Sequence, residues 1–346
     1  MSLINYLINI RNSNKQSMLR DQFGRIHNYL RISLTERCNL RCFYCMPANG
    51  IQLSPKENIM RAEEIEILVS KFVKLGVNKI RFTGGEPFVR KDFDSIATSL
   101  SKLNCEMAIT TNGILIDQHI ETFKNCGIFK INISIDSLKK DKFNSITRRD
   151  YFNRVMDNIE LLFSKGFNPK LNVVVIRGVN DDELIDFIGL TKEWNTTVQF
   201  IEYMPFQGNK WDFSKTVNAE EILQNVSRIF GEGNVLKVED KKNDTSRKYK
   251  IKGFTGNFGM ISTVSNPFCD SCNRIRLTAN GRIKNCLFSG SETDLLTALR
   301  NNENVEELIK ETVFNKKSQR GGIKNFASEE GRLMSESNRS MILIGG

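Results

Sequence analysis

The sequence predicts an α/β protein built on a parallel sheet, because β-rich runs alternate with helical patterns from residue 29 to about residue 205. Six runs rich in branched and aromatic residues are the strand candidates: YLRISLT (29–35), KIRFTG (79–84), CEMAITT (105–111), KINISID (130–136), KLNVVVIR (170–177) and TVQFIEYM (197–204). Six βα units are too few for a closed eight-stranded barrel. They suit either an open, incomplete barrel or a doubly wound sheet.

Helical patterns fill the segments between these strands. In residues 61–76, Ile65, Leu68 and Phe72 fall on one helical face, and Gly76 follows the last turn. Similar patterns predict helices within residues 92–103, 151–166, 181–194 and 211–230, the last with Asn218 as its N-cap. After about residue 206 the alternation stops. A Lys-rich stretch, Gly-rich short strands and helical patterns near 291–300 and 303–316 predict an α+β extension.

The charge balance limits the class of partner. Lys and Arg total 50 against 40 Asp and Glu, a net charge of +10, but no run of five or six basic residues suggests a polynucleotide-binding tail. No apolar run approaches the ~18–20 residues of a membrane helix, and the N-terminus lacks signal-peptide features. We therefore expect a cytoplasmic protein without a nucleic-acid or membrane partner. Of the two histidines, His119 is predicted to be an exposed helix residue.

Three cysteines, Cys38, Cys42 and Cys45, follow the first predicted strand as CNLRCFYC, with the spacing C-x3-C-x2-C. Ligands of parallel α/β folds bind at the carboxyl ends of strands, which is where this trio should lie. Three thiolates can hold a four-iron cluster with one iron left open for a small molecule. The alternative is a zinc site whose fourth ligand lies elsewhere in the chain.

Two further segments carry chemistry. FTGGEPFVR (82–90) follows the second strand, where Gly84 and Gly85 allow a close backbone approach and Glu86 is able to accept a hydrogen bond from an ammonium group. FCDSCNRIRLTANGRIKNCLF (268–288) holds a second cysteine trio with the spacing C-x2-C-x13-C. Arginines alternate after its second cysteine, as on a strand, and suit a phosphate-rich or purine ligand. The alternative for this trio is a small zinc knuckle.

CNLRCFYC together with the GGEP segment resembles the radical S-adenosylmethionine (SAM) family. The motifs LRDQFGRIHNYLRISLTERCNLRCFYCMP, IRFTGGEPFVRKDF, TTNG, INISIDSL, FIEYMP, FCDSCNRIRLTANGRIKNCLF and a final GG are in turn similar to the MoaA family of GTP 3′,8-cyclases. These motifs occur in order from about residue 19 to residue 346. The resemblance implies an incomplete TIM-type barrel in residues 19–215 and an auxiliary-cluster and GTP-binding region in 216–346, with 1–18 as an N-terminal extension.

The resemblance also implies the reaction, which is the first step of molybdenum cofactor biosynthesis. In that family, SAM bound to one 4Fe–4S cluster yields a 5′-deoxyadenosyl radical, which abstracts the 3′ hydrogen of GTP. The carbon radical attacks C8 of the guanine, which a second 4Fe–4S cluster helps to hold, and the product is 3′,8-cyclo-7,8-dihydro-GTP. The implied partners are an electron donor and a MoaC-type cyclic pyranopterin monophosphate synthase. The resemblance leaves a homodimer open.

Residue roles carry over by motif. The two clusters are assigned to Cys38, Cys42, Cys45, Cys269, Cys272 and Cys286. SAM contacts are assigned to Tyr44, Gly85, Ser134 and Met204. GTP contacts are assigned to Arg31, Arg81, Thr110, Lys170, Arg274, Ile275 and Arg276. The family's double-glycine tail, needed for activity, corresponds to Gly345 and Gly346.

One residue departs from the family, which commonly has Arg where this chain has Gln199. Gln keeps hydrogen-bonding capacity and loses the charge, which puts any charge-dependent contact at this position in doubt. Two other functions compete with the cyclase. One is a peptide-modifying radical SAM enzyme, a class that commonly carries more C-terminal cysteines. The other is a zinc-stabilised, basic nucleic-acid-binding protein.

Overall fold

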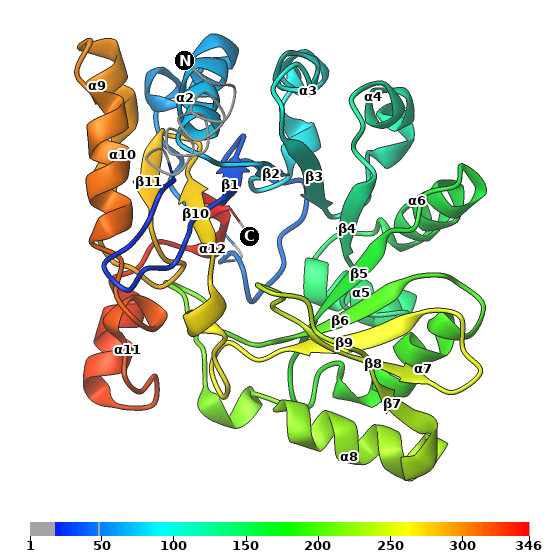
Figure 1. The fold of residues 1–346 in the computed structure, drawn as a ribbon. Coiled ribbons are helices and arrows are strands. Elements are labelled where there is room, and N and C mark those ends of the chain that lie inside the picture. Colours follow the sequence, from blue (N-terminus) through cyan, green and yellow to red (C-terminus); the bar gives the residue numbers. More distant parts are fainter. Residues whose placement is uncertain (1–17, 48, 346) are drawn as a thin grey trace, which may run out of the picture.

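The computed structural model describes residues 18–47 and 49–345, and its centre is one curved sheet with helices packed on the outer face (Figure 1). The twelve strands are ordered β12-β11-β10-β1-β2-β3-β4-β5-β6-β9-β8-β7. The sheet is open, since β12 and β7 are its two edges. The predicted α/β class is therefore confirmed, with an open sheet.

The six predicted strands all form, and each is parallel to the next. They are β1 (Tyr29–Ser33), β2 (Lys79–Thr83), β3 (Glu106–Thr111), β4 (Lys130–Ser134), β5 (Lys170–Val175) and β6 (Thr197–Glu202). The remaining strands are β7 (Val235–Lys237), β8 (Arg247–Ile251), β9 (Asn257–Ile261), β10 (Arg274–Leu277), β11 (Arg282–Lys284) and β12 (Thr293–Asp294).

The number of parallel strands differs from the prediction. β10 pairs in parallel with β1, and β9 pairs in parallel with β6, so two strands of the C-terminal region extend the six-stranded core at both ends. The sequence pattern had no signal for this arrangement, because neither strand belongs to a βα repeat. The C-terminal region thus contributes directly to the same sheet as the N-terminal units.

Most helices cover the outside of the sheet, and α12 (Met341–Ile344) lies inside its curve (Figure 1). The helices agree with most predicted segments. They are α2 (Ala62–Lys74), α3 (Phe93–Leu100), α4 (Ile120–Asn125), α5 (Lys140–Thr147), α6 (Phe152–Ser164), α7 (Leu184–Gly189), α8 (Ala219–Phe230), α9 (Leu295–Arg300), α10 (Val305–Phe314), α11 (Glu329–Glu336) and α12 (Met341–Ile344). Short 3₁₀ turns are η1 (Lys56–Asn58), η2 (Pro87–Val89), η3 (Ile116–Gln118), η4 (Asp181–Glu183), η5 (Leu190–Lys192), η6 (Phe213–Lys215), η7 (Glu232–Asn234), η8 (Cys269–Ser271) and η9 (Arg320–Gly322). Asn218 caps α8, as predicted, and forms a capping box with Glu221.

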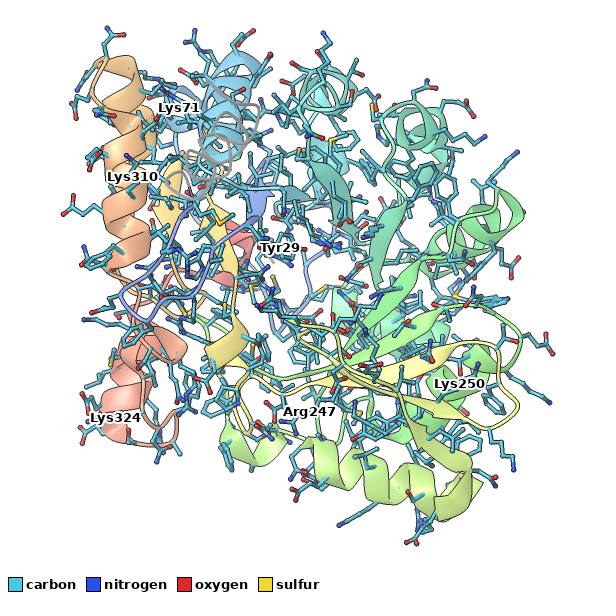
Figure 2. All side chains as sticks on the ribbon, in the orientation of Figure 1. Tyr29, Lys71, Arg247, Lys250, Lys310 and Lys324 are labelled. Atoms are coloured by element: carbon cyan, nitrogen blue, oxygen red, sulfur yellow. The ribbon has the colours of Figure 1, made fainter. Side chains whose placement is uncertain are left out.

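Successive side chains of the strands point alternately to the outer helices and to the space inside the curve of the sheet, and the inward side chains form the site. On β1, Leu30 and Ile32 are fully buried beneath the outer helices, whereas Tyr29 and Arg31 face the space inside the curve. Figure 2 shows Tyr29 in this interior, while Lys310 on α10 projects from the outer surface. The polar positions of the predicted strands are therefore interior positions that line a binding site.

His119 is a correction to the sequence analysis. It lies at the N-terminus of α4 and is buried, with Nδ1 2.8 Å from a carboxylate oxygen of Asp94. Its ring also stacks on Phe88, with 4.4 Å between ring centroids. The helical pattern around His119 did not reveal that a neighbouring helix covers it. Among the described residues, no helix combines the length and apolarity needed to cross a membrane.

Candidate active site

A cavity of about 570 Å³ lies inside the curve of the sheet. All six cysteines of the two predicted trios line it, although the trios are more than two hundred residues apart in the chain. All eight cysteines are free thiols, and Cys105 and Cys126 are not among the lining residues. The structure therefore brings the two trios together in one site, where their thiols line a shared cavity.

The first trio lies on the loop after β1. The Cys38 Sγ accepts a hydrogen bond from the Leu40 backbone N–H at 3.4 Å, and the Asn112 amide group lies 3.9 Å away. Burial raises the pKa of Cys38 to about 11, and burial together with the neighbouring Cys38 raises the pKa of Cys45 to about 12. The Leu40 N–H and Arg41 offset only part of the cost of a charge at Cys38, and a bound metal would stabilise the thiolates further.

The Gly-Gly turn after β2 packs directly on the cysteine loop. The Gly85 N–H donates to the Thr35 carbonyl at 2.7 Å, and the Glu86 N–H donates to the Arg37 carbonyl at 2.8 Å. A Cβ atom on Gly85 would lie 2.3 Å from the Arg37 carbonyl oxygen. Gly85 is therefore required by the packing of two backbones, in addition to any role in binding SAM.

We predict that Gly85→Ala displaces the first cysteine loop. The clash is with backbone atoms, which cannot rotate away, and overpacking of this kind costs about 1–3 kcal/mol. The measurements are the midpoint of thermal unfolding and the iron bound after anaerobic loading. Gly189→Ala is the matched control, because no heavy atom lies within 4 Å of its added Cβ. Equal iron content in the two variants would contradict the prediction.

Glu86 accepts hydrogen bonds from residues of a neighbouring strand end. Its buried carboxylate accepts hydrogen bonds from the Thr111 hydroxyl at 2.8 Å and the Asn112 N–H at 2.7 Å. Burial raises the pKa of Glu86 to about 7. The carboxylate expected to accept from an ammonium group thus joins the ends of β2 and β3, and Asn112 in turn contacts the Asn39 side chain at 2.6 Å.

The residues assigned to SAM, which are Tyr44, Gly85, Ser134 and Met204, all line the cavity. The Tyr44 hydroxyl donates to the Asp136 carboxylate at 2.6 Å, and the other Asp136 oxygen accepts from the Val174 N–H. Burial raises the pKa of Asp136 to about 6. Ser134 at the end of β4 and Met204 after β6 also line the cavity. Tyr44 is therefore oriented by a buried carboxylate that the motif search did not single out.

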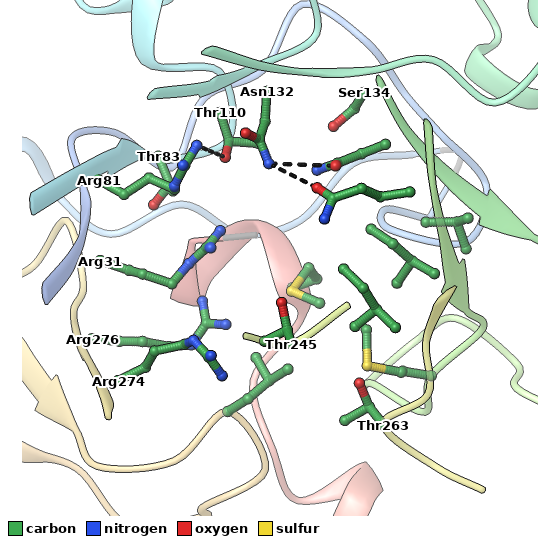
Figure 3. A pocket seen from close by; sticks show the side chains of 18 of the residues that line it. Arg31, Arg81, Thr83, Thr110, Asn132, Ser134, Thr245, Thr263, Arg274 and Arg276 are labelled. Carbon is green, nitrogen blue, oxygen red and sulfur yellow. Dashed lines mark hydrogen bonds between the residues drawn. The ribbon is translucent and has the colours of Figure 1, made fainter. Parts of the chain in front are cut away.

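Arginines from three adjacent strands form one row across the wall of the cavity. Arg31 of β1 is the register partner of Arg276 on β10 and of Arg81 on β2. Figure 3 shows these side chains, with Arg274, directed from one wall into the cavity. Sheet register therefore brings guanidinium groups from distant segments within reach of one anion.

Burial and the closeness of these cations lower the pKa values of two groups in the row. Burial and the neighbouring arginines lower the pKa of Arg31 to about 10, and burial and Arg31 lower the pKa of Arg276 to about 9. Burial alone would raise the pKa of Tyr29, but Arg81 and Arg31 lower it to about 8. A binding site that concentrates positive charge in this way is suited to a polyanion such as a triphosphate.

The other residues assigned to GTP differ in position. Arg81 donates to the Thr110 hydroxyl at 3.3 Å and to the Tyr29 hydroxyl at 2.6 Å. Lys170 lines the cavity at the start of β5, and burial and Lys248 lower its pKa. Ile275 lies on the other face of β10, where it is fully buried in the core and does not line the cavity. The Ile275 side chain therefore does not reach the cavity.

Gln199 belongs to a group of three carboxamides. The Asn132 amide group donates to the side-chain oxygens of Gln199 and Asn172, each at 3.4 Å (Figure 3). These residues lie on β4, β5 and β6 and line the cavity. The neutral Gln199 therefore has polar partners from the neighbouring strands in the position where the family commonly has a charged residue.

The second trio combines η8 with the segment after β11. Lys316 lies after α10 and donates to the Cys272 Sγ at 3.4 Å, while the Arg320 N–H donates to the Cys269 Sγ at 3.4 Å. Burial raises the pKa of Cys272, but Lys316 and Arg274 outweigh it and lower that pKa to about 7. Burial instead raises the pKa of Cys269, so the cationic environment favours the thiolate at Cys272 in particular.

The donor sets fit iron–sulfur clusters. Each trio offers three thiols to the same cavity, and thiolates are the usual ligands of such clusters. Among the described residues, no three Cys, His, Asp or Glu side chains form a group that could hold a single metal ion. In a cluster each thiolate binds its own iron, so the ligands need not converge on one point.

The C-terminal segment enters the site between the trios. The Ser340 hydroxyl donates to the Cys45 carbonyl at 3.0 Å, and Arg276 donates to the carbonyl of Gly345. Gly345 has φ = +79°, and a Cβ atom there would lie 2.6 Å from the Thr83 hydroxyl. Gly346, the other predicted tail residue, lies outside the described residues. The position of Gly345 therefore requires glycine for both conformation and space.

Several residues of the site were not found from the sequence. Asn112, Asp136 and Lys316 reach it from three separate elements. Asp136 and Asn112 follow strand ends, where the parallel-sheet rule gives a signal. Lys316 had no such signal, because it follows a helix near the end of the chain.

Comparisons with known proteins agree with this geometry. Residues 32–191 match the family model described as Radical SAM superfamily, and residues 196–321 match the one described as Molybdenum Cofactor Synthesis C. A GTP 3′,8-cyclase of Clostridium botulinum is 44% identical over 318 residues, which cover 91% of this chain and 98% of that protein. The chain belongs to the GTP 3′,8-cyclase family.

Other members and solved structures extend the comparison. The mitochondrial GTP 3′,8-cyclase of Arabidopsis thaliana is 43% identical, with 97% of this chain and 86% of that protein covered. The human molybdenum cofactor biosynthesis protein 1 is 44% identical over 95% of this chain, which spans about half (51%) of that longer protein. The crystal structure of Streptococcus suis SuiB has a TM-score of 0.60 over 98% of this chain and 77% of its own, at 16% identity, and so shows the fold alone.

Proposed function

We propose that the chain is a radical SAM enzyme that converts GTP to 3′,8-cyclo-7,8-dihydro-GTP. The observation that carries the proposal is that both cysteine trios and the arginine row line one cavity. A cavity of this kind lets a nucleoside triphosphate lie between the two cluster sites. Membership of the cyclase family supports the same substrate. This family membership also favours GTP cyclisation over peptide modification or nucleic-acid binding.

The division of roles follows the two sides of the site. When bound, the first cluster and SAM supply the radical chemistry, and the protein supplies binding and orientation. We assign SAM to the side of Cys38, Cys42 and Cys45, with Tyr44, Gly85, Ser134 and Met204 as contacts. We assign the triphosphate to the arginine row with Lys170 and Thr110, and the guanine to the side of Cys269, Cys272 and Cys286.

The deciding experiment uses GTP that carries deuterium at C3′. The full-length protein is loaded with iron and sulfide anaerobically, then incubated with SAM, a reductant and the labelled GTP. Because the proposed reaction removes the 3′ hydrogen, we expect 5′-deoxyadenosine one mass unit heavier and a nucleotide with a new retention time. The product is an isomer of GTP, so chromatography has to precede mass analysis. Formation of unlabelled 5′-deoxyadenosine alone would contradict the proposal.

The arginine row gives a second prediction. We expect Arg31→Ala and Arg276→Ala each to weaken GTP turnover by more than about a hundredfold, since removing one partner of a buried charge-assisted contact costs about 3–5 kcal/mol and about 1.4 kcal/mol is a factor of ten. Arg247→Ala is the control, because Arg247 is an exposed arginine on β8 (Figure 2). The affinities of the same protein for GTP and for guanosine are compared by equilibrium titration. Equal affinities would show that the phosphates bind elsewhere.

The finer features of the family belong to the same proposal. They are a second 4Fe–4S cluster, an electron donor, a MoaC-type synthase that consumes the product, and a cytoplasmic location. The open sheet is interpreted as an incomplete barrel, with residues 19–215 as the radical SAM unit and 216–346 as the extension. About eight irons per chain are expected when both cluster sites are filled.

A further inference from the structure

We propose that Lys316 raises the reduction potential of the cluster held by Cys269, Cys272 and Cys286. The proposal rests on the second cluster assigned under the proposed function. Its basis is the contact between the Lys316 ammonium group and the Cys272 thiol, 3.4 Å apart. Lys316 is only 3% exposed, so water provides little screening of this interaction.

The position of Lys316 is fixed from several directions. Its ammonium group also donates to the Arg274 carbonyl at 2.9 Å, and its own carbonyl accepts from the Gln22 side chain at 3.1 Å. Arg25 binds the next two carbonyls, of Lys317 at 2.8 Å and of Ser318 at 2.6 Å. Gln22 and Arg25 belong to a short hairpin that a β-bridge between Arg20 and Ile26 closes. Lys316 is therefore held against Cys272 by its own hydrogen bonds and by those of this hairpin.

The same hairpin also holds the cysteine side of the contact. Arg25 donates to the Cys269 carbonyl at 2.8 Å, and the Asp21 carboxylate binds the Arg25 guanidinium at 2.6 Å. One arginine therefore links the loop that carries the second trio to the segment that carries Lys316. This arrangement ties the two segments together close to the contact between Lys316 and Cys272.

A fixed cation next to a cluster ligand changes the energetics of reduction. Reduction adds negative charge, and a positive group with an N–H directed at the ligand sulfur stabilises the reduced form. The first trio has different surroundings. The donors at the Cys38 sulfur are the neutral Leu40 N–H and Asn112 amide, the Arg41 guanidinium binds the Cys38 carbonyl, and buried Glu86 and Asp136 lie nearby. At the second trio, by contrast, a cation donates directly to a cysteine sulfur.

The test isolates the second cluster by working in full-length protein that carries Cys42→Ala. In that background, the midpoint potential is measured by redox titration followed by electron paramagnetic resonance. We expect Lys316→Met to lower the potential, so that at a fixed poise the ratio of reduced to oxidised cluster falls about tenfold, which corresponds to 59 mV for one electron. Lys316→Arg, which keeps the positive charge, should have a potential close to that of the protein with Lys316. Lys317→Met is the matched control, because the neighbouring Lys317 is exposed.

The iron content of each variant shows whether a changed potential or a lost cluster is being observed. A loaded Lys316→Met variant with the potential of the Lys317→Met control would overturn it. If Lys316→Met binds no iron, Lys316→Gln, which retains an N–H donor without the charge, takes its place. Loss of iron in both variants would also overturn it, because Lys316 would then hold the site. Absence of any cluster in Cys42→Ala protein with Lys316 intact would instead refute the second cluster, and the inference with it.

Discussion

Cys42→Ala is expected to abolish both the first cluster and the cleavage of SAM, whereas Cys272→Ala should lose the second cluster and still cleave SAM. The physical reason is that the two trios are separate ligand sets on the loop after β1 and on the segments around β10 and β11. Reductive cleavage needs only the cluster whose open iron binds SAM. The measurements are iron per chain and 5′-deoxyadenosine formed under a chemical reductant.

The control for this pair is Cys105→Ala, since Cys105 lies before β3 and does not line the cavity. It should keep both clusters and near-normal turnover. Two results would contradict the assignment. One is loss of SAM cleavage in Cys272→Ala while its first cluster remains intact. The other is tightly bound zinc at either trio in anaerobically prepared, iron-loaded protein, which would support the zinc alternative.

Removal of Gly345 and Gly346 is expected to eliminate cyclisation of GTP while both clusters and the fold are retained. Arg276 donates to the Gly345 carbonyl, so the tail contacts a residue of the arginine row. The cluster ligands are all held by other segments, which explains why iron binding should survive. We expect Gly345→Ala to have a similar effect, since the added Cβ meets Thr83 at 2.6 Å and φ is +79°.

Gly253→Ala is the matched control for the tail. Gly253 also has a positive φ, of +86°, but it is exposed and no heavy atom lies within 4 Å of an added Cβ. This variant has the same kind of backbone strain without a change at the active site, so its turnover should stay close to normal. Product formation and iron content are measured on the same samples. Near-normal turnover of the truncated protein would show that the tail is only a chain end.

The sequence by itself determined the reaction class and the pattern of each strand. The spacing of the two cysteine trios is a local property, and it was sufficient to predict which residues are candidate cluster ligands. The alternation of residues after Cys272 placed Arg274 and Arg276 on one face of a strand, and the family resemblance assigned Arg31 and Arg81 to GTP. Helix caps such as Asn218 were also predictable, because a cap depends on residues within one turn.

The tertiary structure decided which of these local features meet. That β10 lies beside β1, which places Arg276 next to Arg31, depends on packing over the whole core and leaves no trace in either strand. The same holds for the contact between Lys316 and Cys272, and for His119, which a neighbouring helix buries. Over a few residues, a sequence pattern indicates which side chains share a face and where the chain turns. Contacts between distant segments are selected by the summed free energy of burial, which no single segment contains.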